Sequence, residues 1–237
     1  MSRRVFCVTG IDTDIGKTVV TGLIAKSLLK KGINVITQKI AQTGCEGISE
    51  DIVAHRKLMG IDLCDVDHAG LTCPYLFSQP CSPHLAAKID GGNIEINTIR
   101  ESTDSLLEQF DFVLLEGVGG LSVPLTEDFT LLDYLAKEKY PLILASVSRL
   151  GSINHTLNAL ELAKWRNLEV AAIIYNCFAG EDERIEQDSK LIFEHYMKKF
   201  GFLGPVIKIM HLAQYKKKGM ELPDLSSVVG SDFKNLS

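Results

Sequence analysis

Short apolar runs alternate with longer amphipathic segments along most of this chain. The short runs are typical of strands buried on both faces, and they lie at Val5–Val8, Ile33–Thr37, Phe112–Leu115, Leu142–Val147, Val170–Tyr175 and Val206–Ile209. The longer segments repeat apolar residues at helical spacing, and they predict helices at Thr18–Lys31, Glu50–Met59, Asn97–Phe110, Leu131–Lys139, Ile153–Trp165 and Glu183–Phe200. Residues 60–81 contain two prolines and are expected to be irregular.

The order of these segments predicts an α/β fold. Alternating strands and helices build a mostly parallel sheet with right-handed crossovers and helices on both faces. No repeat or linker divides the chain, so one domain over residues 1–237 is expected, although residues 210–237 show too little periodicity for an element to be assigned. Such sheets bind ligands at the carboxyl ends of their strands. Four polar or glycine-rich stretches follow predicted strands, namely Gly10–Thr18, Lys39–Gly44, Glu116–Gly120 and Asn176-Cys177.

Composition and charge narrow the class of protein. The chain has 237 residues, of which 46% are hydrophobic and 23% charged, so a disordered, collagenous or coiled-coil protein is excluded. The net charge of −5 gives no global attraction to nucleic acid or anionic lipid, and neither is expected as a partner. The six cysteines form no Cys-x-x-Cys pair, which favours free thiols in a reducing compartment. No apolar run approaches the ~18 residues of a membrane span, and Asp12 interrupts the run that starts at Val5, so we expect a cytoplasmic protein without a targeting segment.

The segment Gly10–Thr18 carries the strongest chemical signal. A phosphate-binding loop needs glycine for close backbone approach, a helix N-terminus, a lysine for the β- and γ-phosphates and a hydroxyl for Mg²⁺. Gly16, Lys17 and Thr18 supply these groups between a predicted strand and a predicted helix. Five residues, one more than in the usual pattern, separate Gly10 from Gly16, so a plain strand–helix turn is the alternative. A Rossmann site is not favoured, because Gly-x-Gly-x-x-Gly is absent.

Two acids are candidates for a metal site. Mg²⁺ usually takes one or two carboxylates, together with a hydroxyl and phosphate oxygens. Glu116 follows an apolar run and precedes Gly117–Gly120, where phosphate-loop enzymes carry their second acidic signature. A solvated strand end is the alternative for Glu116. Asp51 opens a predicted helix, but acids are common there and Glu50 competes, so the pattern alone does not choose between them.

The remaining polar residues carry weaker signals. Lys39 follows a predicted strand and either points into the crevice of the phosphate loop or stays solvated. His84 is interpreted as structural, and Lys216–Lys218 as a solvated run. The histidines form no metal-ligand spacing, and no Gly-x-Ser-x-Gly nucleophile motif is present.

Together these motifs resemble those of the dethiobiotin synthetase family. Residues Thr9–Thr18 match its Thr-Gly-x-Asp-Thr-x-x-Gly-Lys-Thr opening, and the longer phosphate loop of that family accounts for the spacing. Further matches follow in order up to about residue 180, at Lys39, Thr43-Gly44, Asp51, Ser82-Pro83-His84, Glu116–Gly120, Gly151–His155 and Asn176. The chain departs from the family at Ile40, where proline is frequent, at Cys177, where aspartate is frequent, and beyond Met210.

The resemblance implies an ATP-dependent ring closure in biotin synthesis. Diaminopelargonic acid and CO₂ (or bicarbonate) would give dethiobiotin, ADP and phosphate through a carbamate and a carbamic-phosphoric anhydride. The resemblance implies Lys17 and Lys39 as catalytic residues, and Thr18, Asp51 and Glu116 as ligands of Mg²⁺. The ATP contacts that it implies are Asp14, Ile15, Gly16, Lys17, Thr18, Val19, Asp51, Glu116, Gly117, Val118, Gly119, Asn176 and Cys177. The implied substrate contacts are Thr13, Lys39 and Thr43, with Gly151 and Asn154 from the partner subunit of a homodimer.

Three alternatives share this fold and loop. Switch-type ATPases of the partitioning and cell-division class resemble the fold, but they carry an extra lysine early in the loop, where this chain has Asp12. An ATP-dependent amidoligase domain of cobalamin synthesis is the second alternative, and Lys39 with Thr43-Gly44 favours the synthetase over it. A non-enzymatic paralogue is the third, and the intact Lys17 and Glu116 weigh against it.

Overall fold

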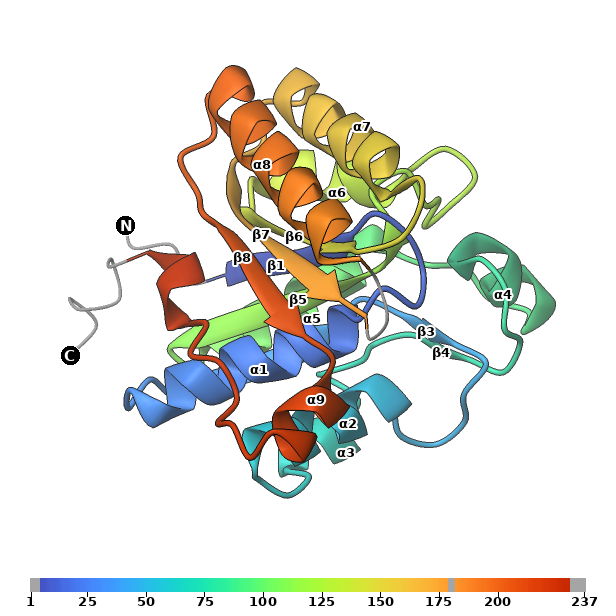
Figure 1. Cartoon of the computed structure of the whole chain (residues 1–237). Coiled ribbons are helices and arrows are strands. Elements are labelled where there is room, and N and C mark those ends of the chain that lie inside the picture. Colours follow the sequence, from blue (N-terminus) through green and yellow to red (C-terminus); the bar gives the residue numbers. More distant parts are fainter. Residues whose placement is uncertain (1–4, 179–181, 231–237) are drawn as a thin grey trace.

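A six-stranded parallel sheet forms the centre of the molecule (Figure 1). The computed structural model describes residues 5–178 and 182–230. The sheet has the order β2-β5-β1-β6-β7-β8, and all five neighbouring pairs are parallel. Its strands are β1 (Val5–Gly10), β2 (Val35–Lys39), β5 (Phe112–Gly120), β6 (Leu142–Val147), β7 (Val170–Cys177) and β8 (Val206–Met210). A separate short parallel pair is formed by β3 (Gln42–Thr43) and β4 (Leu76–Phe77).

Helices cover both faces of the sheet, as the α/β prediction requires (Figure 1). One face packs against α5 (Ile96–Leu107), α6 (Leu131–Glu138), α7 (Ser152–Trp165) and α8 (Glu183–Phe200). The other face packs against α1 (Lys17–Lys30) and the 3₁₀ turn η1 (Ser226–Val229), and α2 (Glu50–Met59) lies beside α1. The remaining helices are α3 (Asp65–His68), α4 (Pro83–Ile89) and α9 (Leu212–Lys217).

Burial on both faces explains why the strands are continuous apolar runs. In β5, Val113 and Leu115 belong to the core on the α5–α8 side, whereas Phe112 and Leu114 belong to the core on the α1 side. Because successive side chains of a strand point to opposite faces, a strand between two helical layers needs apolar residues at every position. This arrangement confirms the predicted α/β class with a parallel sheet.

Five of the six predicted strands reach further toward their carboxyl ends than the apolar pattern predicts, and two of these extensions, in β2 and β5, carry charged residues. The predicted strand Ile33–Thr37 begins and ends two residues later, as β2, so that Lys39 is the last strand residue instead of following the strand. The strand predicted to stop at Leu115 continues to Gly120 and includes Glu116. Polar residues can occupy these buried ends because their side chains find buried partners, a condition that hydrophobic periodicity does not register.

Several short elements were not predicted. The segment 60–81 contains α3 and β4, so the expectation of an irregular segment is only partly right. The turn helix α4, which has Pro83 in its first turn, was also missed. Such elements are too short to show a hydrophobic period.

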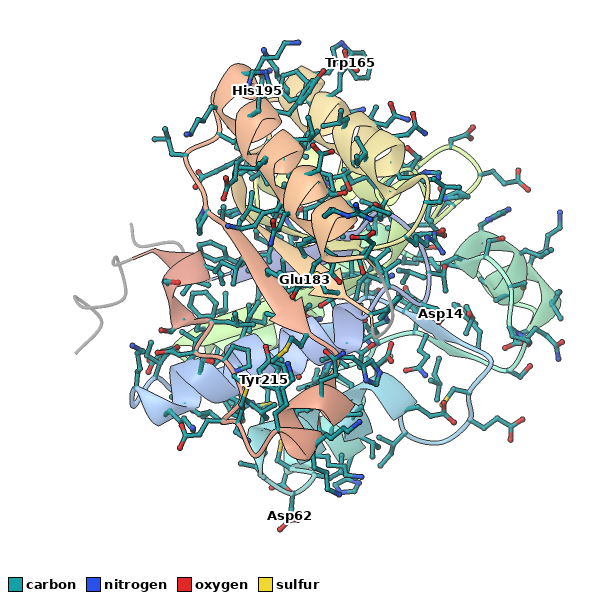
Figure 2. The ribbon with its side chains drawn as sticks, in the orientation of Figure 1. Asp14, Asp62, Trp165, Glu183, His195 and Tyr215 are labelled. Atoms are coloured by element: carbon teal, nitrogen blue, oxygen red, sulfur yellow. The ribbon has the colours of Figure 1, made fainter. Side chains whose placement is uncertain are left out.

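The segment after β8 also carries structure that its weak periodicity did not indicate. Tyr215 of α9 is buried, and its hydroxyl accepts a hydrogen bond from the Met210 N–H at 3.2 Å (Figure 2). Leu225 and Val228 pack on the α1 side of the core, and the Leu225 N–H donates to Ser27 of α1. Residues 231–237 of the predicted tail lie outside the described residues. Among the helices of residues 5–178 and 182–230, none has the length and apolar character to cross a membrane.

Candidate active site

A cavity of about 820 Å³ lies at the carboxyl ends of β1, β2 and β5. Segments distant in sequence meet there, namely the phosphate loop, residues 39–43, the start of α2, residues 80–83 and the end of β5. The predicted site residues that line the cavity are Thr13, Asp14, Gly16, Lys17, Thr18, Val19, Lys39, Thr43, Asp51, Glu116, Val118 and Gly119. The structure therefore brings twelve of the eighteen predicted site residues into one cavity.

The phosphate loop ends in a left-handed turn that only glycine fits. Gly16, the N-cap of α1, has φ 91°, and a Cβ atom there would lie 2.8 Å from Nδ2 of Asn176. Asn176 donates to the carbonyl of Ile15 at 2.6 Å, so β7 braces the loop from behind. The turn directs the free N–H groups of the first turn of α1 at the cavity, which suits an anion.

Lys17 is held against the same loop. Its Nζ donates to the backbone carbonyl of Asp12 at 2.7 Å, and the residue is 7% exposed. Burial, together with the nearby Lys39 ammonium, lowers the pKa of Lys17 to about 8. A polyanion beside Lys17 would supply the counter-charge that this ammonium needs.

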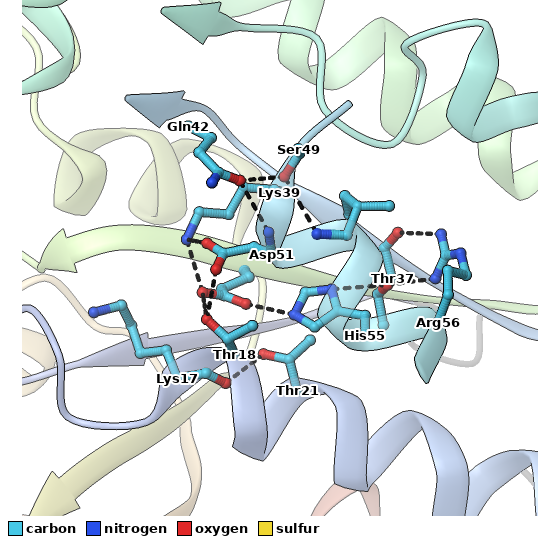
Figure 3. Close-up of polar contacts among 12 residues, drawn as sticks. Lys17, Thr18, Thr21, Thr37, Lys39, Gln42, Ser49, Asp51, His55 and Arg56 are labelled. Carbon is cyan, nitrogen blue, oxygen red and sulfur yellow. Dashed lines mark hydrogen bonds and ion pairs between the residues drawn. The ribbon is translucent and has the colours of Figure 1, made fainter. Parts of the chain in front are cut away.

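Four of the cavity-lining side chains contact one another (Figure 3). We call this group, which consists of Thr18, Lys39, Asp51 and Glu116, the carboxylate cluster. Lys39 Nζ lies 2.6 Å from Asp51 Oδ2 and 2.7 Å from Glu116 Oε1. The Thr18 hydroxyl lies 2.9 Å from Asp51 Oδ1 and 3.2 Å from Glu116 Oε1. One ammonium and one hydroxyl thus bridge two carboxylates that come from different elements.

Strand pairing and a helix N-terminus place the charged members of the carboxylate cluster. Lys39 and Glu116 are register partners on the neighbouring strands β2 and β5, so their side chains leave the sheet side by side. Asp51 stands in the first turn of α2, whose N-cap Ser49 accepts a hydrogen bond from the Ile52 N–H. The Gln42 side chain accepts from the backbone N–H of Asp51 at 3.1 Å and so joins β3 to the start of α2. The structure thereby distinguishes Asp51, which faces the cavity, from its exposed neighbour Glu50.

Opposite charges dominate the electrostatics of the cluster. Burial alone would lower the pKa of Lys39, but the Glu116 and Asp51 carboxylates outweigh burial and raise it. Burial would likewise raise the pKa of Glu116, but Lys39 and His55 hold it well below its usual range. Both groups are therefore charged at neutral pH, although Glu116 is 0% exposed.

The donor set of the cluster suits a hard cation. In the described parts of the chain, no group of three or more His, Cys, Asp and Glu side chains is placed to hold a metal ion. Asp51, Glu116 and the Thr18 hydroxyl instead offer an all-oxygen set of two carboxylates and one hydroxyl, which fits Mg²⁺ that also binds phosphate oxygens and water.

Six predicted residues lie outside this cavity. Ile15 and Gly117 are buried, and Asn176 and Cys177 lie in β7, where Cys177 is 3% exposed and packs in the core. The cavity therefore gives no support to a ligand contact by the Cys177 side chain. Gly151 and Asn154 are exposed at the start of α7, away from the cavity lining.

The site also contains residues that sequence reasoning missed. His55 was set aside because the histidines lack metal spacing, yet its ring contacts Glu116 at 2.7 Å. The available signal was its place four residues after Asp51 in one helix, which puts both side chains on the same face. Gln42, Cys81 and Ser82 also line the cavity.

Comparison with known proteins identifies a matching family model and relatives of high sequence identity. A family model described as an AAA domain matches residues 4–211. The ATP-dependent dethiobiotin synthetase BioD of Chlorobaculum tepidum is 54% identical over 210 residues, which cover 88% of each chain. The ATP-dependent dethiobiotin synthetase BioD 2 of Pasteurella multocida is 50% identical over 197 residues, which cover 83% of this chain and 92% of that protein.

Solved structures with similar folds are much more distant in sequence. A ParA family ATPase from Chlorobium tepidum superposes with a TM-score of 0.53 at 16% identity, covering 100% of this chain and 99% of that one. The pNOB8 ParA bound to nonspecific DNA gives a TM-score of 0.57 at 11% identity, with coverage of 99% and 100%. At such identities the likeness concerns the fold alone. The close relatives decide the family: this chain belongs to the ATP-dependent dethiobiotin synthetases.

Proposed function

We propose that this chain is a ligase that uses ATP to close the ureido ring of dethiobiotin from diaminopelargonic acid and CO₂. The observation that carries the proposal is the position of Lys39, whose ammonium lies between Asp51 and Glu116 in the cavity of the phosphate loop. This position supports the proposal because the ammonium would lie beside the γ-phosphate, where an anionic nucleophile must approach a polyanion.

ATP binding is assigned to the phosphate loop and the first turn of α1. Backbone N–H groups around Gly16 and the Lys17 ammonium would hold the phosphates. Mg²⁺, held by Thr18, Asp51 and Glu116, would offset charge on the phosphate oxygens.

The chemistry proceeds in three steps. One amine of the substrate attacks CO₂ and loses a proton, which gives a carbamate. A carbamate oxygen attacks the γ-phosphorus, and ADP leaves. The second amine attacks the carbonyl carbon of the mixed anhydride and loses a proton, and inorganic phosphate leaves as the ring closes. Lys39 stabilises negative charge on the carbamate and the transferring phosphoryl group, and the cavity-lining Thr13 and Thr43 can donate to carbamate oxygens.

The carboxylate end of the substrate needs a second anion site. We assign it to the start of α7 in the partner subunit of a homodimer, where Gly151 and Asn154 are exposed. Gly151 turns the chain into the helix with φ 88°, and the first N–H groups of a helix favour a carboxylate. The adjacent Leu150 is fully exposed and would be covered by the partner subunit in such a dimer. We also propose a cytoplasmic location, because all six cysteines are free and a reducing compartment keeps thiols in that state.

Phosphate release from ATP tests the proposed reaction directly. Release should require both diaminopelargonic acid and bicarbonate, and it should be lost when either is omitted. ATPase activity indifferent to the diamine and stimulated by a protein or lipid surface would instead support the switch-ATPase alternative.

Mixed dimers test the shared site. Lys39→Ala and Gly151→Phe should each be inactive as homodimers. Mixing them should restore one intact site in each heterodimer, and thus at most about half of normal activity for that species. Absence of recovery despite verified subunit exchange, or an active monomer, would refute the shared site.

A further inference from the structure

His55 is a buried polar residue beside the carboxylate cluster to which the proposed reaction assigns no role. It lies on α2 one turn after Asp51 and is 0% exposed. Its Nε2 lies 2.7 Å from Oε2 of Glu116, and its Nδ1 lies 3.0 Å from the hydroxyl of Thr37 in β2 (Figure 3). One helix therefore supplies a carboxylate to the cluster and, one turn later, an imidazole to the other carboxylate.

The neighbouring hydrogen bonds select one tautomer of His55. Arg56 Nη1 donates to the Thr37 hydroxyl at 2.7 Å, so the oxygen of that hydroxyl already accepts a hydrogen bond. The Thr37 hydroxyl proton is then free to be donated to Nδ1 of His55, which leaves the imidazole proton on Nε2 for Glu116. These hydrogen bonds form a series that runs from Arg56 through Thr37 and His55 to Glu116. Each donor in the series then has an acceptor, as buried polar groups require.

The two carboxylate oxygens of Glu116 have different hydrogen-bond partners. Oε2 accepts from His55 at 2.7 Å. Oε1 accepts from Lys39 at 2.7 Å and from Thr18 at 3.2 Å. A carboxylate held at one oxygen can present its other oxygen in a fixed direction, whereas an untethered carboxylate on a strand end can rotate about χ3.

We propose that His55 is the positioning residue of the cation site: its Nε2–H fixes Oε2 of Glu116 so that Oε1 faces Thr18 and Asp51. This inference rests on the assignment of Glu116 as a Mg²⁺ ligand in the proposed function. Partners that orient a metal ligand in this way commonly contribute 10- to 100-fold to metal affinity or activity. Arg56 and Thr37 hold the ring in turn, since Arg56 is itself paired with Asp67 at 2.8 Å and is 2% exposed.

Two substitutions separate positioning from packing. His55→Leu keeps an apolar volume but removes the donor, and His55→Gln keeps an N–H donor close to the position of Nε2. Binding of a non-hydrolysable ATP analogue is measured at increasing Mg²⁺. We expect the Mg²⁺ concentration at half-saturation to rise about 10- to 100-fold in His55→Leu and to return most of the way to wild type in His55→Gln. Binding in the presence of a chelator should be equal in all three proteins.

A matched control measures the effect of destabilising α2. Leu58 packs beside Gly22 of α1 and makes no polar contact with the cluster, so Leu58→Ala weakens the docking of α2 without touching Glu116. Its Mg²⁺ requirement should stay that of wild type. In the metal-free wild-type protein, ¹⁵N NMR of the histidine ring should find the proton of His55 on Nε2 and not on Nδ1.

The outcomes are distinct. A wild-type Mg²⁺ requirement in His55→Leu, equal behaviour of the Leu and Gln variants, or an Nδ1–H tautomer would overturn the inference. If the Mg²⁺ requirement shifts as expected but phosphate release never depends on the diamine, the positioning role of His55 holds and the proposed reaction fails.

Discussion

Replacing Lys39 by methionine removes the ammonium that lies between the two carboxylates of the cluster. In the wild type, Lys39 Nζ is 2.6 Å from Asp51 and 2.7 Å from Glu116, and its side chain is 7% exposed. Glu116 has a side chain that is 0% exposed, so after the substitution its charge is left with the hydrogen-bond donors His55 and Thr18 and without a lysine partner. Breaking a buried pair by removing one partner typically costs about 3–5 kcal/mol of folding free energy, because the remaining charge is uncompensated.

The expected loss for Lys39→Met in the metal-free protein is therefore about 3–5 kcal/mol at pH 7, measured by urea unfolding. The stability that comes from the lowered pKa of Glu116 is present above the unfolded pKa of about 4.5 and is lost as pH falls through the folded pKa. The gap between wild type and variant should consequently narrow in acid. Turnover should fall about 10²–10³-fold, since a preorganised donor to developing charge is lost.

Lys88→Met is the matched control for this experiment. The Lys88 side chain is 75% exposed and its partner Glu127 is 79% exposed, so this pair lies in solvent. The control should change stability by no more than about 0.5 kcal/mol and leave turnover unchanged. Near-normal turnover in Lys39→Met, or a stability loss no greater than that of the control, would show that this buried ion pair contributes neither to catalysis nor to stability as argued, and would refute the reasoning.

Two further substitutions test the phosphate loop and the choice between neighbouring acids. Asp51→Asn should raise the Mg²⁺ concentration needed for turnover, because a neutral amide is a weaker ligand for a hard cation, while Glu50→Gln on the exposed side should have no effect; the reverse result in a magnesium titration would contradict the assignment. Gly16→Ala should weaken ATP binding by at least tenfold in a calorimetric titration, since the residue needs φ 91° and its Cβ would lie 2.8 Å from Asn176; wild-type affinity would show that the loop tolerates a rearranged turn.

Local chemistry made the phosphate loop and the strand-end acid predictable. The phosphate loop depends on residue types at fixed local spacing, so Gly16, Lys17 and Thr18 identify it without reference to distant parts of the chain. Glu116 was visible because a single charged residue ends a run of apolar ones. The parallel α/β fold was predictable because short, continuously apolar runs alternate with segments of helical periodicity. The runs are continuous because helices cover both faces of the sheet.

Pairs of buried polar side chains that are distant in sequence could not be predicted from the sequence pattern. Thr37, Gln38 and Lys39 look like the end of a strand, yet all three are buried in β2, because side-chain partners 12 to 77 residues away satisfy them. Gln38, for example, accepts from Thr103 of α5 at 2.7 Å. A sequence pattern reports what a side chain is but not which buried group it will meet, so β2 was predicted to end early. His55 was missed for the same reason, since its partner Glu116 lies 61 positions away.

The Arg56–Asp67 pair leads to a last prediction, on stability in acid. Burial would raise the pKa of Asp67, but hydrogen bonds from Arg56, Cys64 and Thr72 outweigh burial and lower it from 3.8 to about 2. Since the folded pKa is the lower one, the stabilisation is complete above the unfolded value and is lost as pH falls from about 4 to about 2. A shift of this size corresponds to about 2 kcal/mol, of which about 1 kcal/mol is lost by pH 3.

The comparison of wild type with Asp67→Asn at two pH values makes this measurable. At pH 7 the variant should be less stable by about 3–5 kcal/mol, because Arg56 is left buried without its counter-charge. At pH 3 the gap in urea unfolding should be about 1 kcal/mol smaller. Asp62→Asn is the control, because Asp62 is exposed at the edge of the molecule (Figure 2) and its substitution should leave stability nearly unchanged at both pH values. A gap that stays constant or widens in acid would mean that Arg56 does not hold Asp67 in its ionised form.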